Sequence, residues 1–469
     1  MDTKKLRQKI LDLAIRGKLV PQDPNDEPAS VLLERIRAEK ERLIKEGKIK
    51  RSKKSTSDTP HYENVPFEVP ETWEWVRLDS IGDIVTGSTP PKDNKELYGG
   101  HIPFYKPTDL EQGINTTTST DSLTEEGFAV ARQLPTDSIL VTCIGATIGK
   151  TGMIRKAGTC NQQINAIVSF PGIFPDYIYY VCISDFMQSN IKDNASATTL
   201  PILNKNHFAE LRIPLPPIEE QKRIVAAIEK WFSLIDTLES AKEDLQTSIE
   251  HTKSKILDLA IHGKLVPQDP NDEPAIEFLK RINPKFTPCD NAHYPFDVPN
   301  NWIWAKGLDI FKPMKTTFPS GDTFKYIDID AIDNKRNVVT SVKVLNTKQA
   351  PSRASRYTEK GCVLFSMVRP YLRNIAMVTE DDCIASTGFF VCQGKGCLSP
   401  KFCYYQMLSN YVVDGLNDFM KGDNSPSITK AQIEKYIFPL PPLNEQKRIV
   451  AKIQELFAVL DEIQKSIEA

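Results

Sequence analysis

Apolar residues recur at alternating spacings of three and four along one segment in the middle of the chain. The series comprises Ile224, Ile228, Trp231, Ile235, Leu238, Leu245, Ile249, Ile256 and Leu259, with Lys242 and Thr252 at its two polar positions. Such a series forms an apolar stripe along a helix, and over about five heptads it predicts a coiled-coil seam. Pro216 and Pro217 precede this helix, and Gly263 is suited to end it. About 45 helical residues would span about 65–70 Å.

The same pattern returns at both ends of the chain. One series leads to the C-terminus through Ile449, Ile453, Leu456, Leu460, Ile463 and Ile467, and another starts the chain with Leu6, Ile10 and Leu13 before Gly17. We expect two long antiparallel helices that form a coiled coil, one continuous and one split between the chain ends. This arrangement would have pseudo-two-fold symmetry and neighbouring termini. An amphipathic helix of an ordinary bundle is the alternative.

Two phrases occur twice with almost no change. KILDLAIRGKLVPQDPNDEPA at residues 9–29 returns at residues 255–275 with Arg16 replaced by His262, and PLPPIEEQKRIV at residues 214–225 returns at residues 439–450 with two changes. The separations of 246 and 225 residues exceed the period of solenoid repeats and indicate a duplicated domain. Between the phrases the two copies have diverged. Since the connecting segments have stayed nearly identical, we infer that one shared constraint acts on both of them.

The repeats divide the chain into connecting segments and two globular units, which we expect to have a mixed α/β fold. Strand-like runs such as residues 138–141 and 362–367 are punctuated by Gly and Pro. The expected parts are an N-terminal helical segment with a basic linker at 1–61, a first unit at 62–213, the central helix and loop at 214–293, a second unit at 294–438 and a C-terminal helix at 439–469.

Composition narrows the class of protein. Hydrophobic residues make up 40% of the chain and charged residues 26%, as in soluble globular proteins, and no apolar run approaches the roughly 18 residues of a membrane span. The nine cysteines include no CxxC pair, and the spacings of Cys392, Cys397 and Cys403 do not suit zinc. Reduced cysteines in a cytoplasmic protein are therefore expected. The net charge of −2 combines an acidic first unit with a basic second unit.

One segment resembles a nucleotide-binding motif. GATIGKT at residues 145–151 has three residues between its glycines, whereas a P-loop requires four. The aligned positions of the second unit, residues 369–374, read RPYLRN. One position with different contents in two copies is typical of a variable contact loop. Because HExxH, GxSxG and GxGxxG patterns are also absent from the sequence, we favour a recognition protein over an enzyme, with a P-loop enzyme as an alternative.

Both units contain candidate contacts to nucleic acid. In the second unit basic and aromatic residues interleave, and arginine can pair with guanine or hold a phosphate. In the first unit the candidates are amide, hydroxyl and amino side chains in two short stretches, together with Lys150. The candidates are Arg353, Arg356, Tyr357, Arg369, Tyr371 and Arg373 in the second unit, and Thr86, Ser88, Lys92, Lys150, Asn161, Gln162 and Gln163 in the first. A turn capped by residues 161–163, and arginines paired with nearby acids, are the structural alternatives.

The repeated phrases, together with the Trp-x-Trp that begins each unit at Trp73 and Trp302, resemble the specificity subunit of type I restriction–modification enzymes over essentially the whole chain. The resemblance implies a non-catalytic, DNA-binding protein whose two units are target-recognition domains. Each would read one half of a bipartite sequence in double-stranded DNA. The long helix could bridge half-sites about 34–36 Å apart.

The resemblance also implies partners. The conserved helices would dock two methyltransferase subunits, restriction/translocase subunits would join the larger complex, and no membrane is involved. S-adenosylmethionine, ATP and Mg²⁺ would bind to these partners, with no cofactor or metal in this chain. The candidate coiled-coil and docking residues are Ile224, Ile228, Trp231, Ile235, Leu238, Ile449, Ile453, Leu456 and Leu460. A coiled-coil adaptor with two protein-binding heads is the alternative.

Overall fold

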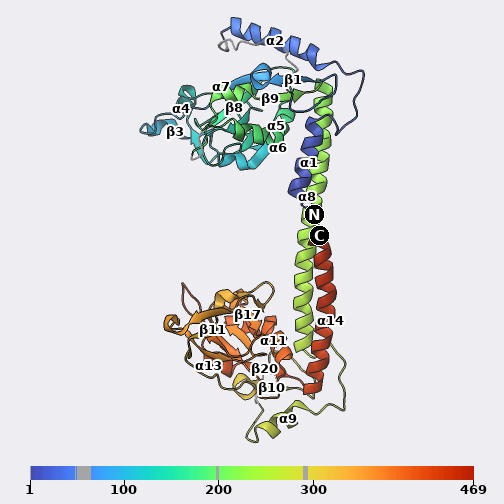
Figure 1. Ribbon diagram of the computed structural model, residues 1–469, viewed down its shortest axis with the longest axis vertical. Coiled ribbons are helices and arrows are strands. Elements are labelled where there is room, and N and C mark those ends of the chain that lie inside the picture. The colour runs from blue at the N-terminus through green and yellow to red at the C-terminus, as the bar shows by residue number, and fades with distance from the viewer. Residues whose placement is uncertain (1, 48, 50–64, 197–199, 289–293, 469) are drawn as a thin grey trace. The chain divides into compact units, whose positions relative to one another are not determined.

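Helix α8 (Ile218–Ile261) contributes to two units of similar architecture (Figure 1). The computed structural model describes residues 2–47, 49, 65–196, 200–288 and 294–468. The N-terminal unit extends from Asp2 to Ala241, and the C-terminal unit begins at Lys242. Most of the basic linker expected from the sequence lies outside the described residues. The prediction of a mixed α/β fold with two globular units and a long central helix is confirmed.

The N-terminal unit is built around two sheets. A four-stranded sheet has the order β2-β8-β5-β6 and a three-stranded sheet has the order β4-β3-β7, while β1 and β9 form a separate antiparallel pair. The strands are β1 (Glu74–Arg77), β2 (Gly82–Thr86), β3 (Tyr98–Tyr105), β4 (Asp121–Leu123), β5 (Ile139–Thr142), β6 (Thr151–Met153), β7 (Thr159–Cys160), β8 (Ile164–Ser169) and β9 (Arg212–Leu215).

Helices surround these sheets and complete the core. The N-terminal helix, α1, places Leu11 in the same apolar core as Ile178 of α5 and Ile224 of α8. The helices are α1 (Thr3–Ile15), α2 (Ala29–Lys45), α3 (Leu78–Ile81), η2 (Lys95–Leu97), η3 (Asp109–Asn115), α4 (Glu125–Val130), α5 (Pro175–Ile183), α6 (Asp185–Asp193) and α7 (Lys205–Glu210).

The C-terminal unit repeats this plan, but each of its two main sheets has one more strand. A five-stranded sheet has the order β12-β13-β17-β16-β19, a four-stranded sheet has the order β14-β11-β18-β15, and β10 pairs with β20. The strands are β10 (Ile303–Lys306), β11 (Thr323–Ile327), β12 (Ile332–Asp333), β13 (Val338–Val339), β14 (Lys343–Asn346), β15 (Ala354–Thr358), β16 (Val363–Ser366), β17 (Ile375–Met377), β18 (Cys383–Ser386), β19 (Phe389–Cys392) and β20 (Ile437–Leu440). The helices are α9 (Ala275–Ile282), α10 (Gly307–Ile310), η4 (Ile329–Ala331), η5 (Thr347–Gln349), η6 (Pro370–Leu372), α11 (Pro400–Leu408), α12 (Asn410–Asn417), α13 (Lys430–Lys435) and α14 (Leu443–Glu468).

Each terminal helix pairs with one half of α8. In the N-terminal unit the guanidinium of Arg7 in α1 bonds Asp236 at 2.5 Å and Glu239 at 3.0 Å. In the C-terminal unit the Lys253 ammonium lies 2.5 Å from the Asp461 carboxylate of α14. The end-to-end meeting of α1 and α14, and hence the neighbouring termini that the heptads predict, would join the two units and stays a prediction.

The predicted apolar seam is divided between buried and open positions. Ile224, Ile228, Ile235, Ile449 and Ile453 are buried, and Leu456 and Leu460 are partly buried against the core. Trp231 and Leu238, in contrast, are 48% and 51% exposed. Leu245 of the predicted series is also exposed, at 41%, so the coiled-coil seam expected from the sequence is not covered by described residues at these three positions. α1 covers one face of α8 and leaves the apolar face with Trp231, Leu234 and Leu238 open.

The two repeated phrases contact each other within the N-terminal unit. The Glu220 carboxylate of α8 accepts hydrogen bonds from Trp73 Nε1 at 2.9 Å and Gln22 Nε2 at 2.5 Å. Arg223 makes a bidentate pair with Asp26 at 2.6 and 3.1 Å. Burial raises the pKa of Glu220 above its ordinary value, and the Trp73 hydrogen bond opposes this rise.

The C-terminal unit repeats the glutamine and arginine contacts of this network, whereas Trp302 Nε1 is buried without a hydrogen-bond partner among the described residues. Gln268 Nε2 donates to Glu445 at 2.6 Å, and Arg448 makes the bidentate pair with Asp272 at 2.6 and 3.3 Å. Burial also raises the pKa of Glu445. Since both partners of the glutamine and arginine contacts lie in repeated phrases, an internal structural requirement accounts for part of the near-identity of these phrases. A shared external partner is not needed to explain these particular positions.

A glycine ends each helix that leads into the repeated loop. Gly17 has a φ of 67° and Gly263 a φ of 69°. A Cβ atom would lie 2.4 Å from the ring of Pro70 at the first position and 2.4 Å from the ring of Pro299 at the second. Glycine is therefore required both by the left-handed backbone and by the close proline.

Candidate nucleic-acid interface

The hairpin that joins β5 to β6 and the hairpin that joins β16 to β17 both have positive φ angles at the same two positions. Gly145 and Gly149 begin and end the first turn with φ values of 101° and 89°, and Arg369 and Arg373 occupy these positions in the second with φ values of 47° and 53°. A left-handed conformation costs an L-residue about 1–2 kcal/mol, a cost that glycine avoids. The C-terminal unit thus places two arginines where its sister unit has the residue that the backbone prefers.

The same neighbouring segment supports both hairpins. The N–H of Gly145 donates to the carbonyl of Pro201 at 3.0 Å, and the N–H of Arg369 donates to the carbonyl of Pro426 at 2.8 Å. The sequence alignment of these loops therefore corresponds to structural equivalence. The scaffold is constant and the side chains on it differ.

The hairpin of the N-terminal unit does not form a phosphate cradle. The N–H groups of Ile148, Gly149 and Lys150 donate to backbone carbonyls within the hairpin at 2.8–3.1 Å, so they are not directed at a ligand. The Lys150 ammonium pairs with the Glu111 carboxylate at 2.7 Å. A P-loop instead presents successive N–H groups and its lysine to phosphate oxygens. This geometry argues against nucleotide binding.

The polar candidates of the N-terminal unit lie together beside this hairpin. Thr86 Oγ1 lies 2.7 Å from Asn165 Oδ1, and Thr89 Oγ1 donates to Gln162 Oε1 at 2.5 Å. The Cys143 N–H donates to the carbonyl of Gln163 at 2.8 Å, which joins this segment to the end of β5. The two polar stretches expected from the sequence are thus adjacent.

Several of these polar groups have structural partners. Asn161 Oδ1 accepts the Gln163 N–H at 3.1 Å, so Asn161 caps a turn, as the structural alternative proposed. Ser88 Oγ accepts the Arg132 N–H at 2.9 Å. Gln162 and Lys92 are exposed. Among the polar candidates, these two side chains extend furthest into solvent.

The arginines of the C-terminal hairpin differ in their surroundings. Arg373 donates to the carbonyl of Leu408 at 2.8 Å and to Asn410 Oδ1 at 2.5 Å, at the junction of α11 and α12. Burial lowers the pKa of its guanidinium. Arg369 is exposed and donates one N–H to the carbonyl of Asn424 at 2.9 Å. Tyr371, at the tip, is 46% exposed.

The other basic and aromatic candidates belong to a different sheet. Arg353 directly precedes β15, Arg356 lies in the middle of this strand, and the Tyr357 hydroxyl lies 3.3 Å from the Asp382 carboxylate. Arg353 is exposed, whereas Arg356 and Tyr357 are half-buried. The structure therefore places Arg369, Tyr371 and Arg373 in one loop and the other three residues along a separate strand.

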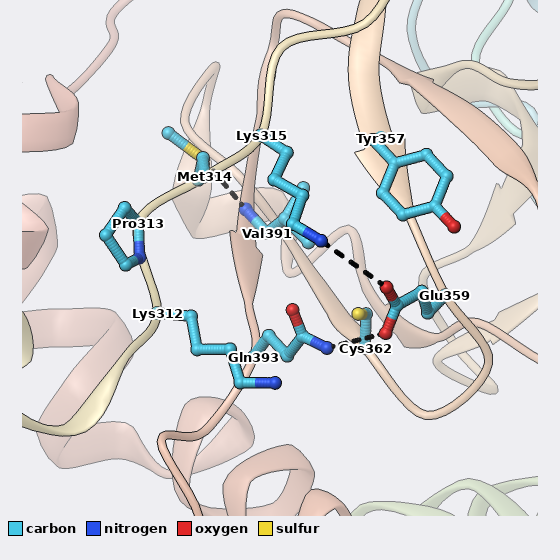
Figure 2. A pocket seen from close by; sticks show the side chains of 9 residues that line it. All are labelled: Lys312, Pro313, Met314, Lys315, Tyr357, Glu359, Cys362, Val391 and Gln393. Carbon is cyan, nitrogen blue, oxygen red and sulfur yellow. Dashed lines mark hydrogen bonds and ion pairs between the residues drawn. The ribbon is translucent and has the colours of Figure 1, made fainter.

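A small cavity lies next to Tyr357 (Figure 2). Glu359 accepts a hydrogen bond from Gln393 at 2.8 Å there, and Lys315 lies 3.9 Å from the same carboxylate. The cavity volume is about 10 Å³. This is space for about one water molecule, so the cavity is too small for a nucleotide base.

Two loops that were not among the sequence candidates border the C-terminal hairpin. Asn334 Nδ2 donates to the carbonyl of Leu372 at 2.9 Å, and Asn337 Nδ2 donates to the carbonyl of Arg373 at 2.8 Å. Residues 421–427 provide the second loop, through the Pro426 and Asn424 carbonyls described above. The only sequence signal was a short basic pair, Lys335 and Arg336, inside an Asn-rich turn.

The described cysteines and acidic residues were the candidates for a metal site. Across the residues that the structure describes, no group of His, Cys, Asp and Glu side chains is arranged to hold a metal ion. Cys392, Cys397 and Cys403 are buried, and burial raises the pKa of Cys392 and Cys397.

None of the described helices combines the length and apolar character needed to cross a membrane.

Two units with one scaffold, different loops at the same position and an internal helical connector define a two-headed recognition protein. Comparison with known families identifies it further. Residues 70–247 and 312–469 match the type I restriction modification DNA specificity domain. The chain belongs to this family, as the repeated phrases indicated.

Relatives of the chain agree with this assignment. The type I restriction enzyme EcoAI specificity subunit of Escherichia coli is 28% identical, in an alignment that covers 99% of this chain and 90% of that protein. The EcoEI specificity subunit of the same species is 25% identical, with coverages of 99% and 91%. Both alignments include the two globular units and the connecting helices.

Solved structures show the same fold. One chain from a study of complex assembly and conformational transition in the type I R-M system aligns with a TM-score of 0.59 and 18% identity, covering 86% of this chain and 94% of that chain. The HsdS subunit from Thermoanaerobacter tengcongensis aligns with a TM-score of 0.50 and 18% identity, with coverages of 85% and 93%.

Proposed function

We propose that this protein is the DNA-specificity subunit of a type I restriction–modification complex. Each globular unit reads one half of a bipartite sequence in double-stranded DNA. The observation that carries the proposal is the pair of equivalent hairpins, in which Gly145 and Gly149 of one unit correspond to Arg369 and Arg373 of the other. One scaffold with two sets of side chains suits two different half-sites.

The connecting helices provide the second part of the function. The open apolar face of α8, with Trp231, Leu234 and Leu238, supports docking of a partner helix. We assign this role to methyltransferase subunits, two per chain because the connectors are repeated. Restriction/translocase subunits would complete the assembly. S-adenosylmethionine, ATP and Mg²⁺ belong to those partners, and catalysis is not assigned to this chain.

Methylation mapping tests the proposal directly. Methylated positions in host DNA are compared between a strain with the gene and a matched strain without it. We expect a two-part sequence with a fixed spacer to be methylated in the first strain alone. An unchanged methylation pattern, together with no salt-dependent binding to any duplex, would favour an adaptor with two protein-binding heads, because phosphate contacts release counterions and make binding depend on salt.

A further inference from the structure

We propose that three loops of the C-terminal unit form one surface that enters a groove of duplex DNA, with Arg369 as the side chain that selects a base. The loops are residues 333–337, 369–373 and 421–427, called here the three-loop surface. Lys335, Arg336 and Lys421 contact phosphates on either side. The inference rests on the proposed function and assigns the residues that carry it out.

Hydrogen bonds join the three loops into one unit. The side-chain amides of Asn334 and Asn337 donate to the hairpin carbonyls of Leu372 and Arg373, at 2.9 and 2.8 Å. On the other side, backbone and side-chain N–H groups of Arg369 donate to carbonyls of the third loop, at 2.8 and 2.9 Å. The surface is therefore fixed in shape before a ligand binds, which reduces the entropy cost of binding.

The exposed groups of this surface match a DNA groove. Lys335, Arg336, Arg369 and Lys421 are all exposed cations, around an apolar tip in which Tyr371 is 46% and Leu372 40% exposed. The Asp333 carboxylate accepts the N–H groups of Lys335 and Arg336 at 2.9 and 3.0 Å, and Asp423 adds one exposed carboxylate to the third loop. Phosphates are contacted by such cations, while arginine and apolar side chains contact base edges.

The sister unit separates the roles of the two arginines. There Gln188 Nε2 bonds the carbonyl of Gly149 at 2.8 Å and that of Cys182 at 2.7 Å, and so attaches the hairpin to the end of α5. Arg373 makes the corresponding attachment to the end of α11. Arg369 corresponds to Gly145. Because glycine has no side chain, the sister hairpin has no side-chain attachment at this position. The bond of the Arg369 side chain to one carbonyl engages one of five N–H donors, which leaves the fork able to pair with guanine O6 and N7.

The equivalent hairpin of the N-terminal unit differs in charge from the arginine-containing hairpin of the C-terminal unit. Its hairpin replaces the arginines with glycine, and the neighbouring loop supplies Glu111, which pairs with Lys150. Ala146 and Thr147 are exposed at that tip, where the C-terminal unit has Pro370 and Tyr371. A neutral loop and a cationic loop on one scaffold are suited to different base sequences.

The test uses the full chain assembled with its methyltransferase subunits and duplexes that contain the mapped target. Arg369→Gly is the central variant because glycine fits the φ of this position and is the residue of the sister hairpin. We expect discrimination at one base pair of one half-site to fall by about 10–100-fold, with the other half-site unchanged. Thermal unfolding of the variant checks that the fold is retained.

A second variant tests the cationic rim. Lys335→Ala with Arg336→Ala should weaken binding to all duplexes about equally and lower the slope of log K against log salt by about 0.9 for each phosphate that the protein no longer neutralises. Full discrimination by Arg369→Gly at every position of the target would overturn the inference. So would a rim variant that binds DNA normally but fails to assemble, since the surface would then contact protein. If the parent complex itself recognises no bipartite target, the proposed function has failed instead.

Discussion

Gly17 shows how one residue can satisfy a backbone and a packing requirement together. Gly17→Ala should lower the free energy of unfolding by about 2–5 kcal/mol, from left-handed strain and from collision with the Pro70 ring. Gly47 is the matched control, because its φ is 71° and no atom of the described residues lies within 4 Å of an added Cβ. Gly47→Ala should cost about 1–2 kcal/mol. Urea unfolding compares the two, and equal decreases would show that the proline contact is unimportant.

The buried carboxylates of Glu220 and Glu445 predict a dependence of stability on pH. Burial raises the pKa of both groups in the folded state. An acid with a raised folded pKa contributes its full stability below the unfolded pKa and loses it as pH rises through the folded pKa. The pH range over which this stability is lost therefore begins near 4.5, the ordinary pKa of a glutamate, and extends to higher pH.

The double variant Glu220→Gln, Glu445→Gln removes both titrations. Relative to this variant, the parent should lose stability as pH rises from 4.5 towards neutrality. Chemical unfolding at a series of pH values measures the difference. Parallel curves for parent and variant, or a parent that gains stability with pH, would contradict the assignment.

At the scale of elements, α8 separates residues that stabilise the chain from residues that are available to a partner. Ile235 is buried and Leu238, three residues later, is 51% exposed. Ile235→Ala should cost about 2–5 kcal/mol of unfolding free energy. Leu238→Lys should change it by about 0.5 kcal/mol or less and yet weaken assembly with the methyltransferase. Unfolding curves and size-exclusion chromatography of the mixed subunits measure the two effects.

If Leu238→Lys assembles as the parent does, the open face of α8 is not the docking surface. If it also unfolds like Ile235→Ala, the side chain is more important to the fold than its exposure indicates. These outcomes are distinct because the first concerns the complex and the second the isolated chain.

The long helix was the element most predictable from sequence. The heptads indicated about 45 residues, and α8 has 44. The same periodicity cannot show what covers each face, so it does not separate the exposed Trp231 and Leu238 from the buried Ile235 in the same seam. The sheets were less predictable, since strands such as β7 and β12 have two residues each and are too short to display a period.

At the candidate site, the repeat predicted the hairpins and missed their neighbours. Aligning the two copies related residues 145–150 to residues 369–374, because an insertion-free alignment keeps equivalent turns together. The side-chain amides of Asn334 and Asn337 donate to backbone carbonyls of the hairpin, and Arg369 of the hairpin donates to backbone carbonyls of residues 421–427. Such contacts depend on the folded chain and leave no residue pattern in the sequence. For the same reason the different surroundings of Arg369 and Arg373 could not be foreseen.

At the scale of the whole molecule, the duplicated network predicts two separable responses. Asp26→Asn weakens the bidentate pair with Arg223, and Asp272→Asn weakens the pair with Arg448. Each should cost about 1–3 kcal/mol locally, because hydrogen bonds between charged groups are broken. Hydrogen exchange should increase in the N-terminal unit for the first variant and in the C-terminal unit for the second. Increases throughout the chain in either variant would show that the units open together.

The paired network also affects how such a gene can change. Gln22, Asp26, Glu220 and Arg223 of one unit have identical counterparts in Gln268, Asp272, Glu445 and Arg448. Recombination within the repeated phrases would join a loop from one copy to a helix from the other, yet every hydrogen-bonding partner would still be present. A whole recognition unit could thus be exchanged with its supporting contacts intact, and a lineage could acquire a new DNA target without first passing through an unstable protein.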